Sequence, residues 1–294
     1  MSKKRSPDRK SKFSQHSKKK KSAGRVKGLS KKPGGEVSSK PTSGEQVEGR
    51  QAVRELLLAG SRNTVEIFLA DDLKEAEILS DIRDIALSMS VPVRTVSRSK
   101  INSKALTSSH QGVIAKADAM KFANFDELIA DPNAFLLVLD GITDPVNLGS
   151  MLRIAECAGV TGIILPGRRS VTITPTVSKT AAGALEHVPI AIVGGVATAL
   201  SEMKKANITT IGLDAAGKHG IFDSSQSLSK PIALVLGKEG SGLSRLVMER
   251  VDTLVSIPLL GELNSLNVAM ATAISCFEIV RRQLETTNEP GNKS

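Results

Sequence analysis

Aromatic residues are scarce in this chain of 294 residues, which has no Trp, no Tyr and 7 Phe. Folds that recognise RNA by stacking bases on aromatic platforms depend on such side chains. The scarcity argues against those folds. If the chain binds RNA, it does so through charge, shape and hydrogen bonds.

Long apolar runs are also missing, and cysteine is rare. No stretch of about 18 apolar residues occurs, so we expect no membrane span. The basic start, residues 1–15, has no apolar segment behind it and does not predict a secretory signal. Cys157 and Cys276 each lie in an apolar helical pattern without a CxxC neighbour. We therefore predict two buried, reduced thiols in a cytoplasmic protein.

Histidines are few as well, and none has a cysteine or carboxylate at a catalytic spacing. No cluster with metal-ligand spacing is visible, so we expect no metal site. The four histidines are His16, His110, His187 and His219.

The positive charge is concentrated at the N-terminus. Residues 1–46 hold 15 Lys and Arg against 3 Asp and Glu, a net +12, whereas the remainder holds 25 against 27, a net −2. A segment so rich in Lys, Ser and Gly buries too little apolar surface to fold. We predict a disordered basic tail whose partner is a polyanion, namely nucleic acid. A solubilising extension without a specific target is the alternative.

Residues 47–117 have the pattern of a small α/β domain. Helical and strand-like periodicities alternate along this stretch. The expected elements are helices at 50–60, 73–89 and 100–106 and strands at 64–69, 92–96 and 111–117. Residues 118–133, with a short helical stretch at 124–130, are expected to form a linker.

From residue 134 the strands become continuous apolar runs. Such runs alternating with helices predict a parallel sheet covered on both faces. The expected strands are 135–139, 162–165, 208–213 and 232–236, and the expected helices are 146–159, 175–185, 196–206 and a long helix at 265–285. This second domain spans 134–286, followed by a tail at 287–294. Ligands of such folds bind beyond the carboxyl ends of the strands, so the loops there should carry function.

The first unusual loop, residues 140–149, leads into a helix. Asp144 is suited to cap that helix and Pro145 to occupy its first turn. Neither reason accounts for Asn147 or Arg153. The apolar neighbours of Arg153 favour a partly buried, functional guanidinium over a solvated one.

The second loop, 237–242, contains three glycines, which permit close approach of the backbone to a ligand; a plain tight turn is the alternative. The third, 257–269, opens an apolar helix with a polar cluster. A helix N-terminus suits a carboxylate or phosphate. Capping by Asn264 or Ser265 alone is the alternative there.

Residues 212–219 come close to a phosphate-binding P-loop. They lack the final Ser or Thr that ligates magnesium, and no helix start follows them. We therefore set nucleotide hydrolysis aside.

In order and spacing, the three loops resemble the three motifs of the SpoU (TrmH-like) family of RNA 2′-O-ribose methyltransferases. The resemblance covers about residues 135–282 and includes DGITDPVNLGSMLR nearly as a block. It implies an α/β fold with a deep trefoil knot, a homodimer, and S-adenosylmethionine as the cofactor held in the knot. The residues that it places against the cofactor are Gly237, Ile257 and Leu266. The residues that it places in the catalytic centre are Asn147, Arg153, Glu239, Ser265 and Asn267.

Methyl transfer from a sulfonium to a ribose 2′-oxygen needs alignment and a more nucleophilic oxygen, and it needs no metal. The resemblance implicates Arg153 in activating the hydroxyl. A guanidinium has a pKa above about 12 and is a poor base. We expect Arg153, helped by an RNA phosphate, to stabilise negative charge developing on the oxygen. Glu239 is the alternative proton acceptor.

Residues 47–117 resemble the substrate-binding domain of the branch that acts on bacterial 23S ribosomal RNA, through VEGRQAVRELL and SSHQGVIAKA. This implies 2′-O-methylation of a guanosine in 23S RNA. Two alternatives remain open: a tRNA 2′-O-methyltransferase of the same family, and a non-catalytic RNA-binding protein on the same fold.

Overall fold

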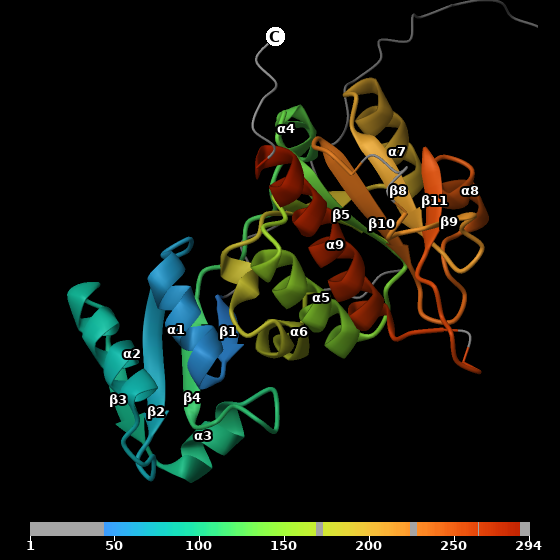
Figure 1. Ribbon diagram of the computed structural model, residues 1–294. Coiled ribbons are helices and arrows are strands. Elements are labelled where there is room, and N and C mark those ends of the chain that lie inside the picture. The colour runs from blue at the N-terminus through green and yellow to red at the C-terminus, as the bar shows by residue number, and fades with distance from the viewer. Residues whose placement is uncertain (1–43, 169–172, 224–227, 264, 289–294) are drawn as a thin grey trace, which may run out of the picture. The chain divides into compact units, whose positions relative to one another are not determined.

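The structure is a computed structural model that describes residues 44–168, 173–223, 228–263 and 265–288 (Figure 1). The first strand, β1, begins at Glu45, so the last two residues of the predicted tail lie in a strand. The last helix, α9, runs to Asn288 and enters the predicted tail at 287–294. The rest of both predicted tails lies outside the described residues.

The first sheet has four strands in the order β1-β4-β2-β3 within the described chain. Strand β4 pairs antiparallel with both β1 and β2, and β2 pairs parallel with β3. The elements of this region are β1 (Glu45–Glu48), α1 (Arg50–Ala59), β2 (Thr64–Ala70), α2 (Glu77–Ser88), β3 (Val93–Val96), α3 (Arg98–Lys104) and β4 (Val113–Ala117). All six elements expected at 47–117 are present. Strand β1, which has four residues of which three are polar, was not among them.

Helices α1 and α2 cover one face of this sheet, and α3 covers part of the other. Leu56 on α1 and Ile82 on α2 are fully buried, and each such side chain contributes about 1.5–3 kcal/mol through burial. Helix α2 begins at Glu77, four residues later than predicted. Leu73 packs on the same core from the preceding turn, which explains why its spacing imitates another helical turn.

The second sheet has seven described strands in the order β7-β6-β5-β10-β8-β11-β9, and every pair is parallel, as predicted. Its strands are β5 (Phe135–Asp140), β6 (Gly162–Pro166), β7 (Ile190–Val193), β8 (Thr209–Leu213), β9 (His219–Gly220), β10 (Ile232–Gly237) and β11 (Thr253–Ser256). Its helices are α4 (Phe125–Ala130), α5 (Pro145–Cys157), α6 (Pro175–Thr180), the 3-10 helix η1 (Ala184–Glu186), α7 (Val196–Lys205), α8 (Arg245–Met248) and α9 (Val268–Asn288).

Alternate residues of each strand point to opposite faces, and both faces are covered. Helices α5, α6 and α9 pack on one face and α4, α7 and α8 on the other. Figure 1 shows α5 and α9 lying next to each other. Helix α4, within the segment predicted as a linker, packs Phe125, Leu128 and Ile129 against the second face. No helix in the described ranges has the length and apolar character needed to cross a membrane.

The parallel arrangement determines where a site can form. Strands β5, β10, β8 and β11 are four consecutive parallel strands of the sheet, so their carboxyl ends meet at one edge. The three unusual loops all begin at this edge. The fold therefore assembles segments that are more than a hundred residues apart in the sequence.

Candidate functional site

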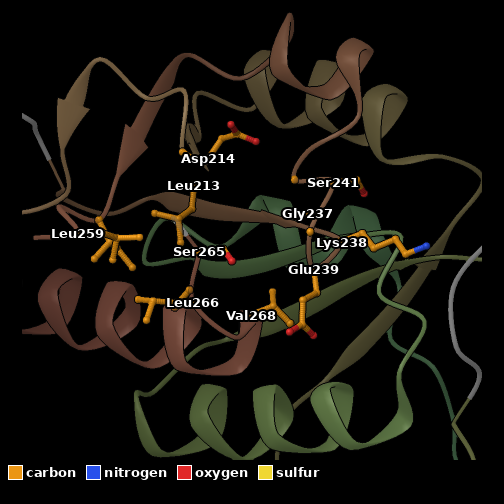
Figure 2. A pocket seen from close by; sticks show the side chains of 15 residues that line it. Leu213, Asp214, Gly237, Lys238, Glu239, Ser241, Leu259, Ser265, Leu266 and Val268 are labelled. Atoms are coloured by element: carbon orange, nitrogen blue, oxygen red, sulfur yellow. The ribbon is translucent and has the colours of Figure 1, made fainter. Parts of the chain in front are cut away.

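A cavity of about 510 Å³ lies at the carboxyl edge of the parallel sheet. Three chain segments enclose it: the turn after β8, the loop after β10, and the chain between β11 and α9 (Figure 2). Its lining residues are Leu213, Asp214, Ala215, Gly237, Lys238, Glu239, Gly240, Ser241, Gly242, Ile257, Leu259, Ser265, Leu266, Val268 and Ala271.

The three residues expected to hold a cofactor, Gly237, Ile257 and Leu266, all line this cavity. Two of the five expected catalytic residues, Glu239 and Ser265, line it as well. The remaining three are not among its lining residues, and hydrogen bonds connect two of them to it.

The glycine loop after β10 is a closed hairpin. Lys238 N–H donates to Gly242 C=O at 3.0 Å, and Gly242 N–H donates to Lys238 C=O at 2.8 Å. A Cβ on Gly237 would lie 2.1 Å from the carbonyl carbon of Gly242. No larger residue fits at Gly237 unless the loop opens. The hairpin carries Glu239 toward the start of α9 beside Val268, whereas Lys238 points away (Figure 2).

A chain of hydrogen bonds joins one residue from each motif. Asn267 Nδ2 donates to Asn147 Oδ1 at 2.9 Å, and Asn147 Nδ2 donates to Glu239 Oε2 at 2.8 Å. Asn147 is buried, being 7% exposed. Three predicted site residues from three separate loops therefore meet in one polar network.

Helix α9 determines which groups donate and which accept in this series of hydrogen bonds. Asn267 Oδ1 accepts from the N–H groups of Ala269 and Met270, at 2.9 and 3.4 Å, and so caps α9. With its oxygen held there, Asn267 can only donate to Asn147. Asn147 in turn can only donate to Glu239, which receives this bond as an acceptor. The network therefore fixes one carboxylate oxygen of Glu239 as the acceptor of this bond.

This cap differs from the alternative considered for the third loop, in which Asn264 or Ser265 caps the helix. Ser265 precedes α9 but does not cap it, and Asn264 lies outside the described residues. The cap is Asn267, because the regular helix begins only at Val268. Asp144 caps α5 as predicted, accepting from Val146 N–H at 2.9 Å, with Pro145 in the first turn.

Two carboxylates that sequence reasoning missed hold the glycine loop from both sides. Asp140, at the end of β5, accepts from Ser244 N–H at 2.9 Å. Asp214, just after β8, accepts from Leu243 N–H at 3.2 Å and from Ala216 N–H at 2.9 Å. Strand β10 lies between β5 and β8, so the carboxylates anchor two successive N–H groups beyond its end. Acidic residues directly after neighbouring parallel strands are the signal that could have identified them.

Arg153 does not join this network in the chain described, and its side chain is exposed rather than partly buried as expected. The cause is helical geometry. Six residues separate Arg153 from the buried Asn147, which places them roughly 120° apart around α5. Met151, Leu152 and Ala155 take the core side of the helix.

Only one of the two cysteines matches its predicted burial. Cys276 is fully buried, and this burial raises the pKa of its thiol to about 12. Cys157 is exposed at the end of α5, four residues from Arg153 and on the same side of the helix. Partial desolvation and the neighbouring Glu156 raise the pKa of Cys157, so neither thiol is activated. In the described ranges no group of three His, Cys, Asp or Glu side chains could hold a metal ion.

Sequence comparisons identify family profiles that match this chain and known proteins that are similar to it. The profile of the SpoU rRNA methylase family matches residues 134–277, and the profile described as RNA 2′-O ribose methyltransferase substrate binding matches residues 46–123. The chain is 38% identical to the 23S rRNA (guanosine-2′-O-)-methyltransferase RlmB of Haemophilus influenzae, over 82% of this chain and 98% of that protein. It is 34% identical to YacO of Bacillus subtilis, named as a TrmH family tRNA/rRNA methyltransferase, over 81% and 96% of the two chains.

Solved structures share the fold. The SpoU methyltransferase AviRb of Streptomyces viridochromogenes, crystallised with AdoMet, matches with a TM-score of 0.68 and 22% identity, over 82% of this chain and 91% of that one. At this identity the likeness concerns the fold.

Proposed function

Because the chain belongs to the SpoU family of RNA methyltransferases, we propose that it transfers a methyl group from S-adenosylmethionine to the ribose 2′-hydroxyl of a guanosine in 23S ribosomal RNA. The family matches cover both sheets, in agreement with the resemblance of the three motifs. The choice of substrate is supported by the similarity to RlmB, which extends over nearly the whole of that protein. The observation that carries the proposal is that the second and third motifs line one cavity, while the hydrogen bonds of Asn147 join the first motif to both of them.

The cavity suits the cofactor. Its volume of about 510 Å³ lies within the usual range for small-molecule pockets, about 300–1,000 Å³. Leu213, Ile257 and Leu266 offer apolar side chains, and the glycine loop offers backbone groups at close range. The close approach of Gly237 and Gly242 closes the hairpin that forms one wall of the cavity. The bound cofactor supplies a methyl group that its sulfonium activates.

We assign the chain's own groups two tasks. Asn147, Glu239 and Asn267 orient the ribose, with Glu239 as a carboxylate that can accept the proton of the 2′-hydroxyl. Arg153 stabilises negative charge that develops on the 2′-oxygen, because a guanidinium remains protonated. Ser265, on the cavity wall, adds a hydroxyl that positions the substrate.

We further propose that the protein is a homodimer. Helix α9 exposes Met270, Phe277 and Leu284, which repeat every seven residues and so form one apolar stripe on its outer side. A second copy of the chain is the partner proposed for this stripe. Light scattering would show a monomer if the stripe remained free in solution.

We also propose the trefoil knot that the resemblance implies. Strand β11 lies between β8 and β9, and both of these neighbours come from one chain segment, 209–220. The connecting turn lies over β11 so closely that a Cβ on Gly217 would be 2.3 Å from the carbonyl carbon of Val255. This arrangement supports passage of the chain after β11 through a loop. A crystallographic chain trace would test it.

We propose that the two sheets belong to two domains with different functions. Residues 47–117 present the RNA, residues 118–133 connect, and residues 134–286 carry the chemistry. Ribosomal RNA as substrate favours the cytoplasm as the compartment. A non-catalytic role is disfavoured because the motif side chains are intact and form an ordered network.

Mapping of 2′-O-methyl groups tests the function directly. Primer extension at limiting nucleotide, which stalls at such groups, is performed on RNA from cells with and without the gene. We expect one stall at a 23S guanosine to vanish without it. Loss of a tRNA ribose methylation with every 23S stall retained would instead establish the tRNA alternative.

A further inference from the structure

Charge is segregated within the first sheet and its helices. Residues 44–92 hold five Lys and Arg against ten Asp and Glu, whereas residues 93–117 hold five Lys and Arg and no acidic residue. The second segment forms β3, α3 and β4. The net charge of the folded chain is near zero, so it does not reveal this basic segment.

The strand register gathers these charges on one face. Arg94 on β3 lies opposite Phe68 on β2, and Lys116 on β4 lies opposite Glu66 on β2. This is the face on which Ile101 of α3 packs against Phe68. Lys104, at the end of α3, joins the cluster, because its Nζ lies over the ring of Phe68. Three cations therefore surround one carboxylate.

The cations are held in place before any ligand arrives. The Nζ atoms of Lys104 and Lys116 lie 4.8 and 5.6 Å from the centre of the Phe68 ring, within the range of cation–π attraction. Lys116 Nζ donates to Glu66 Oε1 at 2.8 Å, and Glu66 Oε2 lies 3.3 Å from Arg94 Nε. These contacts reduce the rotamer freedom that binding would otherwise remove.

The basic surface continues toward the catalytic region. Lys100 is exposed on α3, and the hydroxyl-rich turn after that helix brings Ser109 into contact with Lys179 of α6. The buried carboxylate of Glu48 holds this turn through three hydrogen bonds to Leu106 and Thr107. Helix α6 in turn packs on α5, the helix with Asn147 and Arg153.

We propose that Arg94, Lys100, Lys104 and Lys116, here named the α3 face, bind the phosphate backbone of the RNA substrate. This proposal rests on the proposed function. Lysine and arginine are the groups that neutralise RNA phosphates. The ring of Phe68 is nearly buried, at 5% exposure, and lies beneath the two lysines, so it offers no platform for a base. The α3 face therefore determines where the RNA lies without reading its sequence.

The experiment compares two double variants of the full chain with the same change in charge. Lys100→Gln with Lys104→Gln removes two cations of the α3 face. Lys74→Gln with Arg83→Gln removes two cations in and before α2, on the opposite side of the sheet, and is the matched control. Dissociation constants are measured for unmodified 23S RNA transcribed in vitro, over a range of KCl concentrations, and for S-adenosylhomocysteine.

We expect the α3-face variant to bind the RNA about fivefold or more weakly at 0.15 M salt, and its salt slope to fall by about 1.4–1.8, as expected for two lost phosphate contacts. The control should change neither quantity, and both variants should bind S-adenosylhomocysteine as the parent does. Equal RNA binding by the two variants overturns the proposed role of the α3 face but does not contradict the proposed function. Failure of the parent protein to bind S-adenosylhomocysteine contradicts the proposed function instead.

Discussion

Asn147 and Asn267 are 120 residues apart in the sequence, yet the Nδ2 of Asn267 lies 2.9 Å from the Oδ1 of Asn147. The bond has a defined direction, because the side-chain oxygen of Asn267 caps α9 and only its Nδ2 group is left to reach Asn147. The position of the start of α9 therefore determines, through these two amide side chains, where the carboxylate of Glu239 lies. A stable helix start and a correctly oriented carboxylate are consequences of the same contact.

Asn147→Asp tests this network. The new carboxylate can still accept from Asn267, but it faces Glu239 where an N–H group stood at 2.8 Å. Two carboxylates this close cannot both ionise, so one of them takes up a proton with a raised pKa. We expect a large loss of methyl transfer at neutral pH and a partial recovery, relative to the parent, as the pH falls. Asn133→Asp, on an exposed turn, is the control. A pH profile parallel to that of the parent would contradict the proposed orientation.

Arg153→Ala tests the electrostatic role. Removal of a group that stabilises transition-state charge costs about two orders of magnitude in rate or more. Because Arg153 does not line the cavity, the dissociation constant of S-adenosylhomocysteine should stay the same. Single-turnover kinetics and calorimetry measure the two quantities. Arg83→Ala, an exposed change on α2, should leave both unaltered. Near-normal turnover by Arg153→Ala would refute its proposed role.

Gly237→Ala tests the cradle. The added Cβ would lie 2.1 Å from the backbone of Gly242, so the hairpin that forms one wall of the cavity must open. We expect S-adenosylhomocysteine to bind at least about tenfold more weakly. Gly194→Ala is the matched control, since a Cβ there has no neighbour within 4 Å. Equal affinities of the two variants would show that the hairpin is dispensable for binding.

The sequence predicted the elements that apolar periodicity specifies. The continuous apolar runs of β5, β6, β8 and β10 are all parallel strands in the structure. The short strand β1 was missed because four residues with two Glu give no periodic signal. The start of α2 was misplaced because Leu73, ahead of the helix, is partly buried against the same core. Periodicity reports which side chains face a core, whether or not the backbone is helical.

The loops that meet at the carboxyl edge of the sheet were predictable from the sequence, but the contacts between their residues were not. The three loops were recognisable from their residue types and order, whereas the bonds between Asn147, Glu239 and Asn267 depend on the strand order of the sheet. Asp214 was overlooked because its surroundings imitate a P-loop. The predicted burial of Arg153 was wrong, since apolar neighbours along the chain lie on other sides of the helix.

Deletion of residues 1–43, which leaves β1 whole, tests the basic segment. Residues 1–43 hold 15 Lys and Arg against 2 Asp and Glu, a net +13, while the remainder carries −3, so their loss should weaken RNA binding and flatten the salt dependence because fewer counterions are released. Binding of S-adenosylhomocysteine should persist. Filter binding to 23S RNA at several salt concentrations measures the effect. An unchanged affinity with an unchanged salt slope would identify the segment as a solubilising extension.

Glu48 makes stability depend on acid pH. Burial alone would raise its pKa, but hydrogen bonds from Leu106, Thr107 and Gln46 lower it below the usual 4.5. A group with a lowered folded pKa stabilises the fold above its unfolded value, and this contribution disappears as the pH falls through the folded value. Glu48→Gln should therefore reduce the free energy of unfolding by about 1–3 kcal/mol at pH 7, because an amide NH2 replaces one of the two oxygens and leaves its donors without an acceptor.

The difference between Glu48→Gln and the parent should shrink as the pH falls below 4.5 and through the lower pKa that Glu48 has in the folded protein. Urea unfolding at several pH values measures it. Asp84→Asn, on the exposed side of α2, removes the same charge without a buried partner and should leave the pH dependence nearly unchanged. If the difference stayed constant from pH 7 to pH 3, the ionised form of Glu48 would not be what holds the turn at Leu106 and Thr107. The turn would then depend on packing, and acid would leave the neighbouring α3 face intact.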